Sequence, residues 1–232
     1  MSNPTPLPVS PHVHASAPHR ESDATLIRQV RSKQAKIAVI GMGHVGLPTA
    51  LGFASQGWSV IGADSSLPLI SLLQAGKAPF YEPGLDHLLL QHIGKRFFPV
   101  ENLNQAIREA TIIFLCVGTP QRSSGEADLS QVETAARTIA HNLNGYKLIV
   151  EKSTVPAITA QWIDRTIRRC ARNRHPGAPV ADFDVASTRS SFRKALPSKI
   201  LPGPSESSAG WIPSAPVPYS GRSTGPWAAP CS

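Results

Sequence analysis

The stretch KIAVIGMGHVGLP, from Lys36 to Pro48, decides the fold of this 232-residue chain. It opens with an apolar run and then places Gly41, Gly43 and Gly46 in G-x-G-x-x-G spacing, ahead of a segment with helical character. In such a loop the first glycine permits a tight turn, the second lets a diphosphate approach the backbone, and the third lets the helix pack on the strand. The helix N-terminus adds N–H groups and partial positive charge. The stretch predicts a strand–loop–helix unit that binds a dinucleotide through this loop.

An acidic residue follows at the position that such a unit requires. The next apolar run, SVIGAD, ends on Asp64, 18 residues after Gly46, where a carboxylate would accept hydrogen bonds from a ribose diol. Serines rather than an arginine come next, which favours NAD over NADP as the cofactor. We count His44 and Val45, within the loop, among the candidate cofactor-binding residues. The alternative is that the glycines only make a tight turn.

The rest of the chain alternates strand and helix patterns from Ala35 onward. Strands are predicted from continuous runs rich in Val and Ile, as expected where both faces of a parallel sheet are covered; they lie at 36–41, 59–64, 111–118, 147–153 and 183–187. Amphipathic helices are predicted at 45–56, 67–75, 84–94, 102–110, 129–143 and 159–173, and Ser130 with Glu133 predicts a capping box. This alternation predicts an α/β fold, a Rossmann-like doubly wound parallel sheet.

Three regions follow from this pattern. Residues 1–34 are predicted to be a disordered tail with a short helix around Leu26, Ile27 and Val30. Residues 35–187 form the predicted dinucleotide-binding domain. In residues 188–232, 22 of 45 residues are Pro, Ser or Gly and no period of 2 or 3.6 is present, so we expect disorder there too.

The formal net charge of +8 could indicate a nucleic-acid-binding surface, but its distribution argues against one. Residues 35–187 hold 14 Lys and Arg against 12 Asp and Glu, so most of the excess lies in the flanking segments. No apolar run approaches the roughly 20 residues of a membrane helix, and residues 1–20 do not resemble a signal peptide. We expect a soluble, cytoplasmic protein that binds neither nucleic acid nor membranes, and no metal site is predicted.

Several motifs, taken in order, resemble the UDP-glucose/GDP-mannose dehydrogenases, which oxidise a nucleotide-sugar alcohol to the acid. KIAVIGMGHVGLP is similar to the family's first strand and turn. APFYEPGLDHLL, from Ala78, resembles its Glu-Pro-Gly-Leu segment, and FLCVGTP with GEADLS, between Phe114 and Ser130, resembles its cofactor-side loop. IVEKSTVP, from Ile149, resembles the strand end that presents a catalytic-site threonine. The likeness covers residues 36–187.

The resemblance implies NAD as cofactor and a nucleotide sugar as substrate in the intact family. It implies that Gly41, Gly43, Gly46 and Asp64 hold the adenosine and diphosphate half of NAD. His44 stands where the family usually has a tyrosine, which leaves stacking at that position open.

Other site residues are implied in the same way. Thr119 would line the cofactor cleft, unless it only caps a strand end, and Thr154 would be the catalytic-site threonine that helps to position a water. Glu82, Pro83 and Gly84 would be substrate-side or structural residues; alternatively, Glu82 caps the following helix. Cys116 lies inside a predicted strand, which favours a core position over a nucleophile.

The resemblance stops after Ser187, where the family continues Asn-Pro-Glu-Phe-Leu and this chain reads TRSSF. The loss of one nucleotide would explain the change. The codons ACC CGG AGT TCC TTC encode TRSSF, and one A restored in front gives AAC CCG GAG TTC CTT, which encodes Asn-Pro-Glu-Phe-Leu. Residues 193–195, 203–208 and 223–226 can restore to family-like text in the same frame. We therefore expect residues 188–232 to be out of frame and to carry no selected chemistry.

A shifted frame would remove the second half of the family enzyme. That half supplies the nucleophilic cysteine, a lysine and most sugar-nucleotide contacts, so we expect an NAD-binding domain that is inactive alone. The intact family forms homodimers largely through the missing central helix, which leaves the assembly of this chain open. The alternatives are a non-catalytic, NAD-responsive binding module and a protein whose basic tails bind nucleic acid.

Overall fold

The computed structural model describes residues 20–123, 125–152, 159–174 and 181–188. Their strands form one sheet of order β3-β2-β1-β4-β5-β6 in which all neighbours are parallel. The strands are β1 Ile37–Ile40, β2 Val60–Ala63, β3 Phe97–Val100, β4 Ile112–Leu115, β5 Lys147–Glu151 and β6 Phe183–Ser187. This strand order is that of a doubly wound dinucleotide-binding sheet, so the predicted α/β Rossmann-like fold is confirmed.

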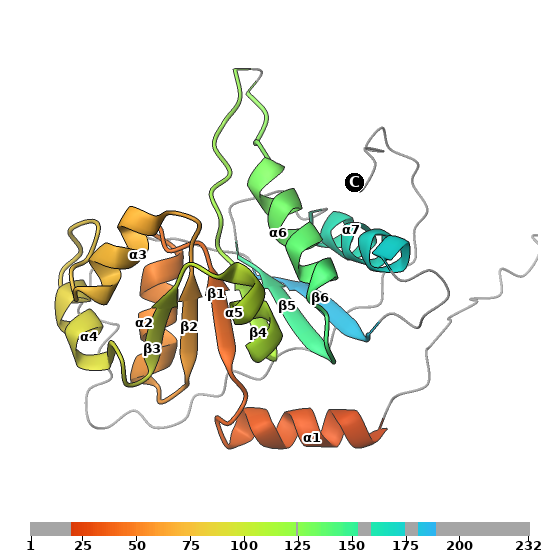
Figure 1. Ribbon diagram of the computed structural model, residues 1–232, viewed down its shortest axis with the longest axis horizontal. Coiled ribbons are helices and arrows are strands. Elements are labelled where there is room, and N and C mark those ends of the chain that lie inside the picture. Colours follow the sequence, from red (N-terminus) through yellow and green to blue (C-terminus); the bar gives the residue numbers. More distant parts are fainter. Residues whose placement is uncertain (1–19, 124, 153–158, 175–180, 189–232) are drawn as a thin grey trace, which may run out of the picture.

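Helices connect the strands and cover both faces of the sheet (Figure 1). They are α1 Arg20–Arg31, α2 Gly46–Ser55, α3 Leu67–Gln74, α4 Leu85–His92, α5 Leu103–Glu109, α6 Ser130–His141 and α7 Thr159–Arg174. One hydrophobic core lies under α5, α6 and α7, and a second lies under α2, α3 and α4. None of the helices in the described ranges has the length and apolar character needed to cross a membrane.

Each predicted strand and helix of the domain is present; most are shorter than predicted by one to three residues at an end, β6 has the predicted bounds, and α7 is one residue longer. β3 was not predicted. Its sequence FFPV contains Pro99, which cannot donate a backbone hydrogen bond and is therefore restricted in sheets largely to edge strands. β3 is an edge strand and pairs with β2, Pro99 opposite Gly62. A Cβ on Gly62 would lie 2.6 Å from both the Met42 sulfur and the Phe97 ring, so only glycine lets these two buried side chains meet over β2.

The predicted short helix near the start of the chain is α1, which begins at Arg20. It lies beside the amino ends of the strands, on the side of the sheet opposite to the loop that joins β4 to α6 (Figure 1). After α1, the Lys33 ammonium donates to the Gln56 carbonyl, and the Arg96 guanidinium donates to the Gly57 carbonyl. Both cations therefore sit at the C-terminal end of α2, where the helix dipole is negative. The predicted disorder of residues 1–19 and 189–232 falls outside the described residues.

The predicted capping box at α6 is wrong. Leu129, rather than Ser130, is the N-cap residue, and no side chain caps the helix from that position. The Asp128 carboxylate accepts the Ser130 N–H instead (3.0 Å), while Glu133 pairs with Arg137 one turn later (2.7 Å). In a capping box the Glu133 carboxylate would accept the Ser130 N–H. Because the Asp128 carboxylate accepts this N–H instead, Glu133 is available for the i,i+4 ion pair with Arg137.

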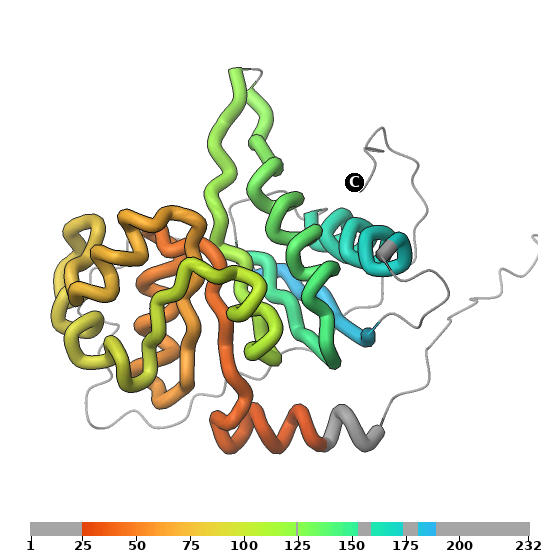
Figure 2. Tube along the Cα trace, in the orientation of Figure 1, coloured from red at the N-terminus to blue at the C-terminus, as the bar shows by residue number. Residues whose placement is uncertain are grey.

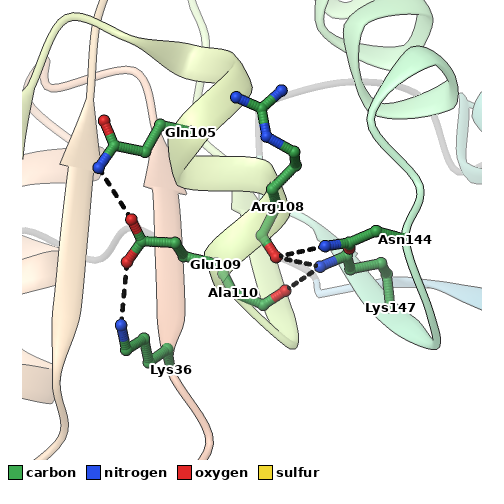
Figure 3. A network of polar contacts seen from close by, with 7 residues as sticks. All are labelled: Lys36, Gln105, Arg108, Glu109, Ala110, Asn144 and Lys147. Carbon is green, nitrogen blue, oxygen red and sulfur yellow. Dashed lines mark hydrogen bonds and ion pairs between the residues drawn. The ribbon is translucent and has the colours of Figure 1, made fainter.

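A network of polar contacts lies at the amino ends of the strands (Figure 3). The buried Lys147 ammonium donates to the carbonyls of Arg108 (3.1 Å) and Ala110 (2.6 Å) at the C-terminal end of α5. Asn144 also donates to Arg108, and Lys36 pairs with Glu109 at 2.9 Å. The hydrogen bond from Lys36 lowers the pKa of the Glu109 carboxyl. Burial, in turn, lowers the pKa of Lys147 to about 8.

This burial predicts a pH-dependent stability. With a folded-state pKa of about 8 against 10.5 for an ordinary lysine, the folded protein binds fewer protons than the unfolded protein between these values. The free energy of unfolding should therefore rise with pH across that interval, relative to a Lys147→Met variant without the titrating group. Urea denaturation of both proteins at about pH 7.5, 9 and 10 measures the difference. A difference that stays constant with pH would contradict the prediction.

Candidate functional site

The glycine loop between β1 and α2 is fixed by close backbone packing. Gly41 has a φ of +94°, and a Cβ there would lie 2.7 Å from the Cys116 carbonyl oxygen. A Cβ on Gly46 would lie only 1.7 Å from the Gly41 carbonyl oxygen. The first and third glycines of the motif are therefore obligatory for this turn, as the sequence predicted.

The second glycine serves a different purpose. Gly43 is exposed, and a Cβ added to it would meet nothing within 4 Å. Directly after it, α2 begins at Gly46 with Val45 as its N-cap, a residue whose side chain cannot accept a hydrogen bond. Within the first turn of α2, Leu47 donates its N–H to the Gly43 carbonyl at 3.1 Å and Pro48 has no N–H, so what the turn offers an anion is the open space over Gly43 and the positive end of the helix dipole. That combination of room and positive helix dipole fits a diphosphate.

Asp64 lies beside this loop, at the carboxyl end of β2. One carboxylate oxygen accepts the Met42 N–H at 2.8 Å, and the other accepts the Ser66 N–H at 2.9 Å. Each oxygen has a further lone pair, so the half-buried carboxylate can still accept hydrogen bonds from a diol. The fold thus brings together the predicted glycines and the predicted acid.

The segment between α3 and α4 contacts the loop through an aromatic pair. The rings of His44 and Phe80 are stacked, with centroids 4.1 Å apart and planes 17° apart. Stacking at His44, which the sequence left open, is therefore present within the protein. Phe80 itself was not singled out from the sequence, because nothing in the linear pattern indicated that its segment would fold back onto the glycine loop.

The Glu82, Pro83 and Gly84 stretch leads into α4. Gly84 is the N-cap, with a φ of +82°, and no side chain caps the helix from that position. The Glu82 main-chain carbonyl accepts the Leu85 N–H at 3.0 Å, so this residue supports the turn through its backbone. Its half-buried carboxylate has no hydrogen bond to another of the described residues.

The loop that carries Thr119 extends from the carboxyl edge of the sheet as two limbs side by side (Figure 2). Gln121 and Ala127 form an antiparallel bridge, and the Arg122 guanidinium pairs with the Asp128 carboxylate at 2.9 Å. The hydrogen bond from Arg122 lowers the pKa of Asp128 to about 2. Thr119 is half-buried at the base of this loop.

The catalytic candidate Thr154 lies outside the described residues. The strand before it is placed: β5 ends at Glu151, and the Lys152 N–H donates to the Leu115 carbonyl of β4 at 2.9 Å. Cys116 follows β4 and is buried, and burial raises the pKa of its thiol to about 12. A thiol that stays neutral at physiological pH is a poor nucleophile, which agrees with the expected core role.

The described residues can bind a dinucleotide but contain no group placed for metal chemistry. Within the described ranges, no three His, Cys, Asp or Glu side chains gather as metal ligands would. The loop instead offers open space at Gly43, the N-terminus of α2 and a fixed carboxylate at Asp64. These are the features that hold a diphosphate and a ribose at the carboxyl ends of parallel strands.

The sequence also matches known proteins over this domain. It is 40% identical over 160 residues to the UDP-glucose 6-dehydrogenase TuaD of Bacillus subtilis, covering 68% of this chain and 33% of that protein. It is likewise 40% identical over 161 residues to a UDP-glucose 6-dehydrogenase of Rhizobium meliloti, covering 68% of this chain and 35% of the relative. The chain thus spans about a third of the length of these relatives.

Solved structures of similar proteins share the fold. The UDP-glucose dehydrogenase of Pyrobaculum islandicum superimposes with a TM-score of 0.60 at 34% identity, over 66% of this chain and 35% of that one. The GDP-mannose dehydrogenase of Pseudomonas aeruginosa superimposes with a TM-score of 0.58 at 30% identity, over 65% and 35%.

Residues 35–194 match the sequence profile described as the NAD-binding domain of the UDP-glucose/GDP-mannose dehydrogenase family. The match includes the glycine loop, Asp64 and the whole sheet. The chain therefore belongs to the UDP-glucose/GDP-mannose dehydrogenase family and contains its NAD-binding domain.

Proposed function

We propose that NAD lies across the carboxyl ends of β1, β2 and β4, with its diphosphate over Gly43 and the first turn of α2. The ribose hydroxyls of its adenosine half would donate to Asp64. The observation that carries this assignment is the contrast within the loop: Gly41 and Gly46 have no room for a side chain, while Gly43 borders open space. Such a contrast is expected where one glycine serves a ligand and the others serve the turn.

The remaining site residues are assigned by the same proposal. Thr119, at the base of the β4–α6 loop, lines the cofactor cleft. Glu82, with Pro83 and Gly84, faces the substrate side or shapes the start of α4; its uncommitted carboxylate favours the first role. Thr154 helps to position a water near the reacting carbon.

The whole protein is proposed to oxidise a nucleotide sugar of the UDP-glucose type at a CH–OH group, with NAD accepting the hydride. When bound, NAD supplies this hydride chemistry, while the residues described here bind and orient it. A cytoplasmic setting follows from the proposed cofactor and substrate, which are both cytoplasmic metabolites. Because Cys116 is buried and its thiol neutral, we propose that the 232 residues bind NAD without completing the oxidation alone.

The different surroundings of Gly43 and Gly46 predict that NAD affinity and the free energy of unfolding can be changed separately by substitution. Gly43→Ala should leave the free energy of unfolding within about 1 kcal/mol of wild type, because its Cβ meets no protein atom, yet weaken NAD binding about tenfold. Gly46→Ala should destabilise the fold, because its Cβ would clash with the Gly41 carbonyl. Calorimetric titration with NAD and urea denaturation measure the two effects.

Gly52→Ala is the matched control for Gly43→Ala. It adds the same methyl group to α2, also into open space, but away from the loop. It should keep wild-type NAD affinity and gain up to about 1 kcal/mol of helix stability. The proposal is wrong if Gly43→Ala binds NAD as tightly as Gly52→Ala does.

The chain alone is predicted not to reduce NAD with UDP-glucose. Absorbance near 340 nm, where NADH absorbs, should stay flat when purified protein is mixed with both compounds. A full-length UDP-glucose dehydrogenase run under identical conditions is the positive control. Steady NADH formation by this chain would show that the described domain contains all the necessary groups, contrary to the proposal.

We also propose that the sequence after Ser187 is read one nucleotide out of frame. Sequencing the gene from the codon of Ala181 downstream tests this directly. The expected result is a family-like continuation, beginning Asn-Pro-Glu-Phe-Leu, in the neighbouring frame. A neighbouring frame without such text would refute the hypothesis and would require a separate explanation for residues 188–232.

A further inference from the structure

We propose that the His44 imidazole, held against Phe80, is a proton-linked contact for the NAD diphosphate. This inference rests on the proposed NAD site and adds a charge-dependent element to it. The glycine motif accounts for backbone donors only, and it assigns no charged side chain to the diphosphate. His44 supplies one, because it directly follows Gly43 and is exposed at the tip of the loop.

The stacking geometry leaves the imidazole nitrogens available. In a parallel stack with a 4.1 Å centroid separation, Phe80 covers one face of the imidazole ring, whereas the N–H bonds lie in the ring plane and point past the phenyl ring. Phe80 therefore fixes the ring orientation without consuming a hydrogen-bonding group.

The segment that carries Phe80 is itself anchored. The Asp86 carboxylate in the first turn of α4 accepts the Ala78 N–H at 3.1 Å, which ties the segment before the stack to the helix after it. The aromatic pair thus links the glycine loop to a braced segment. An imidazole held in this way loses less conformational freedom on binding than an unrestrained side chain would.

Few titratable groups surround the stack. The Phe80 segment contributes Lys77, Tyr81 and Glu82, and the first turn of α4 contributes Asp86, whose carboxylate accepts the Ala78 N–H. β2 contributes Asp64 with both oxygens bonded to backbone N–H groups, and the end of β4 contributes the neutral Cys116 thiol. The first and last turns of α2 contain no acidic or basic residue. Of these groups, Glu82 is a carboxylate without a hydrogen bond to another of the described residues, so it is the one replaced as a control below.

A proton-linked contact has a defined thermodynamic signature. Imidazole side chains titrate near neutral pH, and a diphosphate favours the protonated form, so binding should be accompanied by proton uptake. The affinity for NAD should be about three- to fivefold higher at about pH 6 than at about pH 8, the size expected of a solvent-exposed charge pair.

The test is calorimetric titration of the full chain with NAD at about pH 6, 7 and 8. At about pH 7 it is repeated in two buffers of different ionisation enthalpy, which gives the protons taken up per NAD bound. His44→Tyr keeps an aromatic ring on Phe80 but cannot become cationic. Glu82→Gln removes the titratable carboxylate of the Phe80 segment, and Phe80→Leu removes the aromatic face while keeping the imidazole.

The inference predicts that wild type and Glu82→Gln take up protons and bind more tightly at low pH, and that His44→Tyr does neither. Phe80→Leu should bind NAD at about pH 6 with an affinity closer to that of His44→Tyr than to that of wild type, because the imidazole is then no longer held in place by the stack. If NAD binds but the pH dependence survives in His44→Tyr, or is absent from wild type, the inference is overturned while the proposed function stands. If wild type does not bind NAD at any pH, the proposed function falls and the inference falls with it.

Discussion

The carbonyl oxygen of Gly41 and the Cα of Gly46 lie so close that a methyl group between them would sit 1.7 Å from the oxygen. This contact starts α2 directly over the end of β1. The strand end is held from both sides, because the Gly41 N–H donates to the Ala63 carbonyl of β2 and the Cys116 N–H donates to the Ile40 carbonyl of β1. The position of the helix N-terminus, and with it the anion-binding end of the helix dipole, follows from this clamp.

Polar groups are arranged differently at the amino ends and at the carboxyl ends of the strands. At the amino ends, Lys147, Asn144 and Lys36 satisfy the C-terminal carbonyls and the acidic side chain of α5, so polar groups there are paired with one another. At the carboxyl ends, Gly43 borders open space and α2 lacks a side-chain cap. Parallel strands place all their carboxyl ends together, which brings the open space over Gly43, the positive end of the α2 dipole and the Asp64 carboxylate to the same side of the sheet.

Much of the fold could be predicted from the sequence because continuous Val- and Ile-rich runs and amphipathic segments follow one another with regular spacing. β3 was missed because Pro99 interrupts its pattern, and only its place at the sheet edge makes the proline tolerable. The capping box failed because Ser130 and Glu133 matched a local rule that Asp128 overrode. The local pattern could not reveal which nearby acceptor would reach the N–H first.

Some features of the candidate site could likewise be predicted from the sequence, and others could not. That Gly41, Gly46 and Asp64 lie together at the carboxyl ends of β1 and β2 was predictable, because their spacing along the chain matches that of a strand–loop–helix–strand unit. The His44–Phe80 stack and the close approach of Met42 and Phe97 to Gly62 were not, since they join segments whose proximity arises only from the tertiary fold.

Asp64 has a consequence for how this domain could change its cofactor. Its two carboxylate oxygens accept the Met42 and Ser66 N–H groups, so the side chain supports the loop structure in addition to its proposed role as a ligand for sugar hydroxyls. Replacing it with a neutral apolar residue, as acceptance of a 2′-phosphate would favour, would leave two backbone donors without their acceptor. If Asp64 selects the cofactor as proposed, a change from NAD to NADP at this position would also require new acceptors for the Met42 and Ser66 N–H groups.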